Sequence, residues 1–305
     1  MSSAPRLLRA CTFPPSGTSA DLAVSGGADS LGLLLLALEA GLHVRVHHVN
    51  HHARAASDAD ATFVRELCDR MGVACVLHDV QVEPRANFEA RARAERRRVL
   101  PAGSLTGHTM DDLAETVVLN VLRGAGIDGL SPLVGDPTKP LTRLRRSELV
   151  TLVNEANLVA RHDESNDDLS YRRNRVRHQL LPLMCEVAER DVVPLLARQA
   201  EVVYEDRLWL NLVSEPDATL ALGEADCREL REWPVARRRR WLRAKLFFVD
   251  EFDDEHPPSV AELERAERVI AGEVVATELQ GGRRLSRRGQ RLVLEGGSTT
   301  LTKHG

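Results

Sequence analysis

Short apolar runs alternate with amphipathic stretches along the first part of the chain. The runs at 21–25, 44–49, 73–80 and 104–106 are brief and rich in Val and Leu, which is typical of buried strands. Between them, apolar residues have helical spacing at 29–40, 57–71, 88–100 and 110–123. This alternation predicts an α/β fold, in which a parallel sheet is covered by helices on both faces. Ligands of such sheets bind beyond the carboxyl ends of the strands.

The pattern changes after Gly124. Gly, Pro and Asp concentrate at 124–140 and predict a loop, and a helix is expected at 146–156. The region 176–209 is mostly helical in pattern, with Pro182 and Pro194 as expected boundaries or kinks.

A second unit is predicted from about Pro216 onward. It contains an Arg-rich helix near Arg237, a helix that Ser259 and Glu262 cap, and a hairpin at 274–295. The length of 305 residues also indicates two domains, at about 150 residues each. We therefore expect an α/β domain with a helical extension over residues 1–212 and a small α+β domain over 213–305.

Composition narrows the class of protein. Charged residues make up 28% and the net charge is −4, so nucleic-acid binding has to rest on local patches. The 5 cysteines contain no C-x-x-C pair, which argues against a disulfide framework and a zinc ribbon. The most apolar run, 31–42, is shorter than the roughly 18 residues of a membrane span, and residues 1–15 contain no long apolar stretch, so we expect no secretory signal. We expect a cytoplasmic protein with no membrane contact.

The turn Ser25-Gly-Gly-Ala-Asp-Ser30 joins the first predicted strand to a helix. Glycines allow a tight turn and a close approach of the ligand, and a helix start favours phosphate. The serines add hydroxyl donors, and Asp29 is a candidate ligand of Mg²⁺. An ordinary tight turn with Ser and Asp as caps explains the turn equally well if it is taken alone.

A second strand-to-helix turn carries Gly107-His-Thr-Met-Asp-Asp-Leu-Ala-Glu115. Thr109 and Asp112 form a capping box, which accounts for Asp112 without any function. It does not account for His108 or Glu115. Asp111 and Glu115 are four residues apart and share a helix face, which suits a metal or a cationic substrate.

Four histidines, His47, His48, His51 and His52, suggest a metal site at first sight. Their i,i+4 spacing brings ligands together only in a helix, and the β-branched run before them predicts a strand. We favour a strand end that lines the pocket over a zinc site.

Arginines account for nearly all of the basic residues and gather in three patches. Arg173, Arg175 and Arg177 lie in the first patch, Arg237 to Arg240 form the second, and Arg283, Arg284, Arg287 and Arg288 lie on the predicted hairpin. Such runs are often solvated surface, but three of them in an acidic chain favour phosphate binding.

Several motifs in order resemble a known family. Ser25-Gly-Gly-Ala-Asp-Ser30 resembles the S-G-G-x-D-S signature of the PP-loop ATP pyrophosphatases. Further motifs are similar to those of the bacterial tRNA(Ile)-lysidine synthetases, in their short C-terminal form: His48-Val-Asn-His51, the 107–116 cluster, Leu122-Arg-Gly124, Asp163-Glu-Ser-Asn166 and Arg173-Asn-Arg-Val-Arg177.

This resemblance implies a reaction. ATP adenylates the carbonyl oxygen at carbon 2 of the wobble cytidine of an isoleucine tRNA with a CAU anticodon, and the ε-amine of L-lysine then attacks carbon 2 and displaces AMP to give lysidine. Residues 1–212 would be the catalytic domain and 213–305 a tRNA-binding domain. The resemblance leaves a homodimer open.

The resemblance also implies roles for residues. ATP would be bound by Ser25, Gly26, Gly27, Ala28, Asp29, Ser30, His48 and Asn50, with Asp29 on Mg²⁺. Catalysis would involve Asp29, His108, Asp111, Asp112, Glu115 and Arg123, where Arg123 neutralises charge on the transferring phosphoryl group. The tRNA would be held by Arg173, Arg175 and Arg177 near the active site and by Arg283, Arg284, Arg287 and Arg288 farther away.

Two departures limit the resemblance. Leu113 stands where the family commonly has Gln, and Lys139 precedes Pro140 where Arg is more usual. Other readings are a PP-loop enzyme of different chemistry, such as tRNA thiolation, and an inactive tRNA-binding module. Paired cysteines, which thiolation generally needs, are absent, and the intact Asp29 argues against an inactive module.

Overall fold

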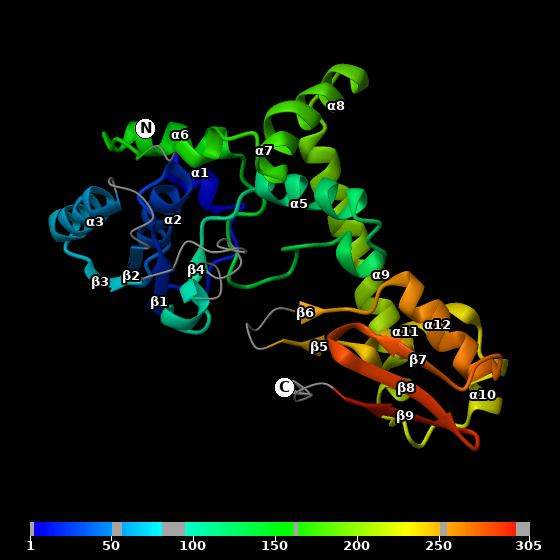
Figure 1. Ribbon diagram of the computed structural model, residues 1–305. Coiled ribbons are helices and arrows are strands. Elements are labelled where there is room, and N and C mark those ends of the chain that lie inside the picture. Colours follow the sequence, from blue (N-terminus) through cyan, green and yellow to red (C-terminus); the bar gives the residue numbers. More distant parts are fainter. Residues whose placement is uncertain (1–2, 51–56, 81–94, 162–163, 251–254, 297–305) are drawn as a thin grey trace. The chain divides into compact units, whose positions relative to one another are not determined.

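The computed structural model describes residues 3–50, 57–80, 95–161, 164–250 and 255–296. The chain forms two compact units, residues 1–207 and 208–305 (Figure 1). The division falls within the long helix α9 (Val193–Ala218), which continues through Pro216. The boundary expected between residues 212 and 213 lies on this same helix and stays a prediction.

The first unit is built on a parallel sheet of strands in the order β3-β2-β1-β4. The strands are β1 (Ser19–Ala23), β2 (His43–Asn50), β3 (Ala74–Asp79) and β4 (Leu105–Thr106). Ala23 pairs with His47 and with Thr106, so the carboxyl ends of β1, β2 and β4 lie at one edge of the sheet. The expected α/β fold is confirmed. The predicted helix at 88–100 falls largely outside the described residues, which show helix at 95–99.

Helix α2 (Ala28–Glu39) occupies the centre of the first core. Its Leu31, Leu33, Leu34 and Leu36 are fully buried, because the sheet covers one side of the helix and other helices cover the rest. These are α1 (Ala4–Leu8), α3 (Ser57–Met71) and α6 (Arg146–Glu155).

Gly32 sets how closely α6 approaches α2. A Cβ at Gly32 would lie 3.0 Å from Cδ2 of Leu149 on α6, so the two helices pack with no room for a side chain there. This close packing brings the start of α6, and with it Arg146, to the start of α2.

The rest of the first unit is helical. Helix α5 (Met110–Leu122) packs on a continuous helical segment made of α7 (Arg172–Arg175), the π-helical turn η3 (Val176–Leu180) and α8 (Leu181–Ala188), and it also packs on α9. Short 3₁₀ turns lie at η1 (Ile127–Gly129) and η2 (Glu164–Asp167). Leu113 is buried in the contact with α9, among apolar residues.

The second unit packs three helices on an antiparallel sheet. The helices are α10 (Cys227–Glu232), α11 (Val235–Leu246) and α12 (Val260–Ala271), and the sheet is β7 (Ala276–Leu279), β8 (Arg283–Arg288) and β9 (Arg291–Glu295), with the 3₁₀ turn η4 (Gln280–Gly282) between β7 and β8. A separate pair joins β5 (Phe248–Val249) to β6 (Glu255–His256). The predicted capping box of Ser259 and Glu262 is present at α12. In the described residues, no helix is both long and apolar enough to cross a membrane.

Candidate active site

The turn after β1 has the shape of an anion cradle. The hydroxyl of Ser30 accepts hydrogen bonds from the amides of Ser25 and Gly26, at 3.2 and 3.1 Å, and donates to the carbonyl of Gly27 at 2.9 Å. Gly26 has φ +92°, a conformation that side chains disfavour. The turn is thus held from within by Ser30, and the first amides of α2 are at its end.

The second strand-to-helix turn touches the first. A Cβ at Gly107 would lie 2.6 Å from the carbonyl oxygen of Asp29, so only glycine allows this approach. The contact sets the start of α5 beside the start of α2. The two sequence clusters therefore meet in one pocket, as their positions after adjacent strands imply.

Arg146 joins the carboxylates of the two turns. Its Nε lies 2.8 Å from Oδ2 of Asp29, Nη2 lies 3.1 Å from Oδ1 of Asp112, and Nη1 lies 3.5 Å from Oε1 of Glu115. Sequence reasoning missed this residue. A signal was present, because an arginine in the first turn of a helix opposes the helix dipole, and such local violations mark functional positions.

Glu115 is enclosed by two further arginines. Its side chain is 1% exposed, and Nε of Arg173 and Nε of Arg177 lie 2.8 and 2.6 Å from its two oxygens. Arg173 also reaches Oδ1 of Asp112 at 2.9 Å. Buried carboxylates and guanidiniums thus balance each other here, and removing one charge would leave the others uncompensated.

The surroundings of Asp29 and Asp112 shift the pKa values of these two carboxyl groups in opposite directions. Burial raises the pKa of Asp112, but Arg146, Arg173 and the amide of Thr109 outweigh it and hold this pKa at about 2. Burial also raises the pKa of Asp29 above its usual value, and there the opposing effect of Arg146 is the smaller one. Asp112 is therefore a permanent anion, and it forms the predicted capping box with Thr109 through its other oxygen.

Asp29 has a free ligand atom. Within the part of the chain that the structure describes, its buried Oδ1 has no hydrogen-bond partner. An orphaned carboxylate oxygen beside a phosphate cradle fits Mg²⁺, which commonly takes one or two protein carboxylates together with substrate phosphates. A cluster of three or more candidate ligands is not found among the described residues, so the phosphates would complete the coordination.

His108 lines the pocket as a neutral imidazole. Burial is the main reason that its pKa falls to about 4, and its Nδ1 lies 2.8 Å from the hydroxyl of Thr106. The pocket encloses about 660 Å³. Its lining includes Ser25, Asp29, His108, Asp112, Arg146, Arg173 and Arg177.

Several predicted residues lie elsewhere. Asp111 does not line the pocket and instead accepts hydrogen bonds from Arg145 and from the amide of Arg146. Its carboxylate fixes the start of α6. Arg123 is not in the pocket either, because it follows the far end of α5, roughly 12 Å along the helix axis from Glu115 at 1.5 Å per residue. Its expected contact with the transferring phosphoryl group stays a prediction, which the lining of this pocket does not support.

His48 and Asn50, which were expected to bind ATP, also lie outside the pocket lining. His48 is buried and bonds the carbonyl of Val24 at 2.8 Å, and Asn50 donates to Asp58, so neither lines the pocket. His48 supports the turn from behind. His47 lies on β2, which is a strand as expected, and its ring bonds His78 and Asp21. His51 and His52 lie outside the described residues.

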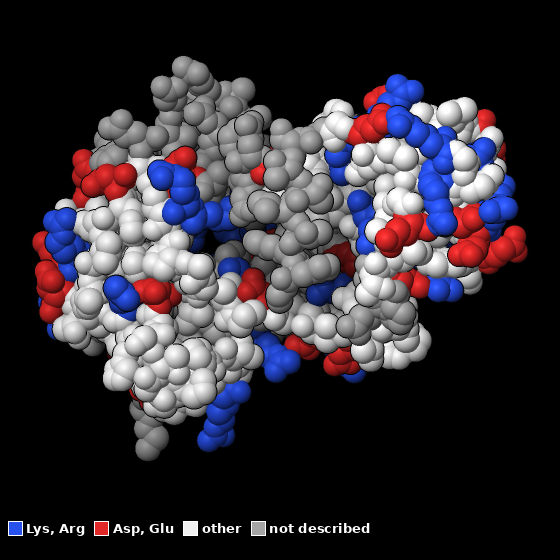
Figure 2. Space-filling model, turned by 90° about the horizontal axis from the view of Figure 1, so that it is seen from below, with Lys and Arg blue, Asp and Glu red and all other residues white. Residues whose placement is uncertain are grey.

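The hairpin arginines do not form one surface. Arg283 is 6% exposed, donates to the carbonyl of Leu246 and lies over the ring of Phe248, so it cannot contact tRNA as expected. Strand alternation places it beside the buried Leu285. Arg284 and Arg288 face solvent, beside Glu278 and Glu295. Figure 2 shows acidic and basic side chains interspersed on the face drawn, with no single basic field.

Comparisons with known proteins agree with this geometry. The PP-loop domain family matches residues 6–184. A tRNA(Ile)-lysidine synthase from Gloeobacter violaceus is 36% identical over 270 residues, which cover 79% of this chain and 80% of that protein. The chain belongs to the tRNA(Ile)-lysidine synthase family.

Other members of the family extend the match. The tRNA(Ile)-lysidine synthase of Mycobacterium leprae is 33% identical over 299 residues, 93% of this chain and 90% of the relative. A longer synthase from Solibacter usitatus is 39% identical, and the match spans 57% of its length. Among solved structures, the U34-tRNA thiolase NcsA from Methanococcus maripaludis gives a TM-score of 0.54 at 17% identity, over 68% of this chain and 78% of that one, which shows a shared fold.

Proposed function

We propose that this protein ligates L-lysine to carbon 2 of the wobble cytidine in isoleucine tRNA with a CAU anticodon. ATP first adenylates the oxygen at carbon 2 and releases pyrophosphate, and the lysine ε-amine then expels AMP. The observation that carries the proposal is the meeting of the Ser25–Ser30 turn with His108 and Asp112 in one pocket, where Arg146 links Asp29 to Asp112, in a chain of this family. A cytoplasmic location accompanies this function.

The turn is the binding site for the phosphates of ATP in this proposal. Its shape is kept by Ser30, so the Ser25 hydroxyl and the first amides of α2 meet the ligand with little reorganisation. Asp29 would hold Mg²⁺ through Oδ1, and the ion would supply charge stabilisation to the phosphates when bound.

The acids have different tasks. With a pKa of about 2, Asp112 is a weak base, so it suits holding positive charge rather than removing a proton. Arg146 and Arg173 are the charges it holds in the structure, and both line the pocket. They are placed to meet the anionic adenylate that forms on cytidine.

The decisive experiment follows the modified nucleoside. Purified protein, tRNA transcript, ATP and lysine are incubated, and the nucleosides are analysed by mass spectrometry. We expect cytidine to gain one lysine residue, only when both ATP and lysine are present. Unchanged cytidine with correctly folded protein contradicts the proposal, and a sulfur-containing pyrimidine would indicate thiolation.

The cysteines do not favour thiolation. Burial raises the pKa of Cys11 and of Cys68 to about 12, so both remain thiols near neutral pH. Each of the 5 cysteines is free, and none of them lines the pocket. Because the likeness to the thiolase is one of fold, it adds no support for that chemistry.

A further inference from the structure

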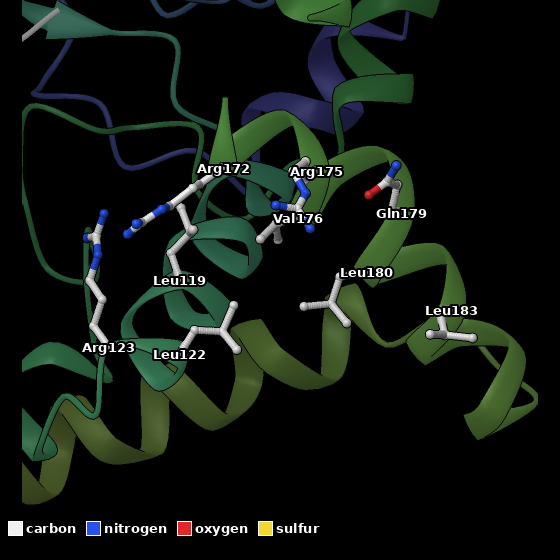
Figure 3. A pocket seen from close by; sticks show the side chains of 9 residues that line it. All are labelled: Leu119, Leu122, Arg123, Arg172, Arg175, Val176, Gln179, Leu180 and Leu183. Carbon is white, nitrogen blue, oxygen red and sulfur yellow. The ribbon is translucent and has the colours of Figure 1, made fainter. Parts of the chain in front are cut away.

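A second hollow lies on the other side of the α7–η3 segment from the active-site pocket. It encloses about 490 Å³, and we call it the arginine groove (Figure 3). Its lining includes Arg123, Arg172, Arg175, Leu122, Leu180 and Leu183. The guanidinium ends of Arg123 and Arg172 point toward one another, and Leu119 lies beside Arg172 (Figure 3).

The segment divides its arginines between two sites. Arg173 and Arg177, four residues apart, face Glu115 and line the active-site pocket. Arg172 and Arg175, three residues apart, line the arginine groove. The two sites therefore share one helical wall, and a helix with its side chains is about 10–12 Å across.

The charge of the groove is not balanced. In the described ranges, the side chains of Arg123, Arg172 and Arg175 form no hydrogen bond or ion pair, and no acid is among the lining residues. The contrast with Arg173 and Arg177 is direct, because those two are neutralised by Glu115. Three unpaired guanidiniums favour an anion and disfavour the ammonium group of lysine.

The floor of the groove is apolar and open. Leu122 is 65% and Leu183 is 52% exposed, so both present apolar surface in the same hollow as the arginines. A ligand that is both anionic and apolar is therefore favoured, and nucleotides combine a phosphate with a flat base. The exposure of these leucines suits an RNA strand that lies across the surface rather than an enclosed small molecule.

We infer that the arginine groove binds an unpaired nucleotide of the tRNA close to the reacting cytidine. This inference rests on the proposed function. Arg123, Arg172 and Arg175 hold the phosphates, and Leu122, Leu180 and Leu183 contact the base. An RNA strand that delivers one nucleotide to the pocket passes over the shared wall, so its neighbour reaches the groove.

The test uses the full chain and an anticodon stem-loop RNA. Arg172→Ala/Arg175→Ala removes two charges from the groove, and Arg9→Ala/Arg198→Ala removes two exposed charges elsewhere in the first unit. We expect about tenfold weaker stem-loop binding for the groove pair, the equivalent of one lost charge-assisted hydrogen bond. The salt slope should also fall by ~0.7 for each lost phosphate contact. The control pair should retain affinity and slope.

Two further measurements separate the possible outcomes. Leu122→Glu leaves the arginines and adds a carboxylate at an exposed position, so it should also weaken binding while circular dichroism stays unchanged. If the wild-type protein makes lysidine but the groove pair binds the stem-loop like the control pair, the groove inference is overturned and the proposed function stands. A raised KM for ATP with unchanged RNA binding would identify a free-nucleotide site and also overturn it. Failure of the wild-type protein to make lysidine concerns the proposed function alone.

Discussion

The two units use arginine in opposite ways. In the second unit, Arg238 and Arg239 share Glu267, and Arg237 pairs with Asp217 while it lies over the ring of Trp233. These contacts join elements of that unit to one another. In the first unit, Arg173 and Arg177 line a pocket and pair with the buried Glu115.

The comparison shows what a run of arginines can indicate. The runs 237–240 and 172–177 each contain 4 arginines, but the guanidiniums of the first are largely neutralised by neighbours within the unit. Affinity for RNA depends on charge that remains available, because a paired arginine must first give up its partner. The two regions differ because Arg237, Arg238 and Arg239 are all paired, whereas in the described residues the run 172–177 keeps Arg172 and Arg175 without an ion pair.

The largest expected difference between the two arginine regions is in the free energy of unfolding, when one acid is removed from each. Glu115→Gln leaves Arg173 and Arg177 without their deeply buried counter-ion, and we expect a loss of about 3–5 kcal/mol of unfolding free energy. Glu267→Gln should cost about 1 kcal/mol, because Arg239 is partly exposed. Urea denaturation measures both.

The same pair of variants separates stability from catalysis. Pyrophosphate release, measured per folded molecule, should fall for Glu115→Gln and stay at the wild-type rate for Glu267→Gln. Equal losses of stability in the two variants would show that the two arginine regions are not different in kind.

Asp29→Asn tests the catalytic half of the comparison. The variant loses the charge of the orphaned Oδ1 beside the phosphate cradle, while Arg146 keeps Asp112 and Glu115 as partners. We expect adenylation to slow by ~10²–10³-fold, as for the loss of one preorganised interaction. Pyrophosphate release is assayed with circular dichroism as the folding control, and near-normal turnover in folded protein would refute the assignment.

His108 predicts a pH dependence of stability. Its pKa falls from 6.5 in the unfolded chain to about 4 in the folded protein, chiefly through burial. The unfolded state thus binds more protons between these values, so stability is complete above pH 6.5 and decreases as the pH falls toward 4, by up to roughly 3 kcal/mol. His108→Gln should flatten this part of the curve. His43→Gln, at an exposed position, is the control and should leave it as in the wild type.

Much of the site could be predicted from the sequence. The two strand-to-helix turns lie after adjacent parallel strands, so the meeting of Asp29 with Asp112 and Glu115 follows from fold class and local pattern. The capping box of Thr109 could also be predicted from the sequence, because it depends on residues three positions apart.

Contacts between residues far apart in the sequence could not be predicted from these local patterns. Arg146 lies 117 residues from Asp29, and their contact depends on the packing of α6 against Gly32. The positions of Arg123 and Arg283 follow from simpler rules. Helix rise places Arg123 far along α5 from Glu115, and strand alternation places Arg283 on the same face as the buried Leu285.

The smallest expected effect concerns the exposed hairpin arginines, Arg284 and Arg288, which lie opposite Glu278 and Glu295. Because these exposed ion pairs are weak, RNA phosphates can replace the glutamates at little cost. Arg284→Ala/Arg288→Ala should therefore reduce the salt slope of full-length tRNA binding by at most ~0.7 per contact and spare binding of the isolated anticodon stem-loop. The first-unit pair Arg175→Ala/Arg177→Ala should reduce binding of both RNAs. If both pairs weaken both RNAs equally, the two units do not contact separate parts of the tRNA. If the hairpin pair changes neither, its arginines serve the second unit alone, as Arg238 and Arg239 do.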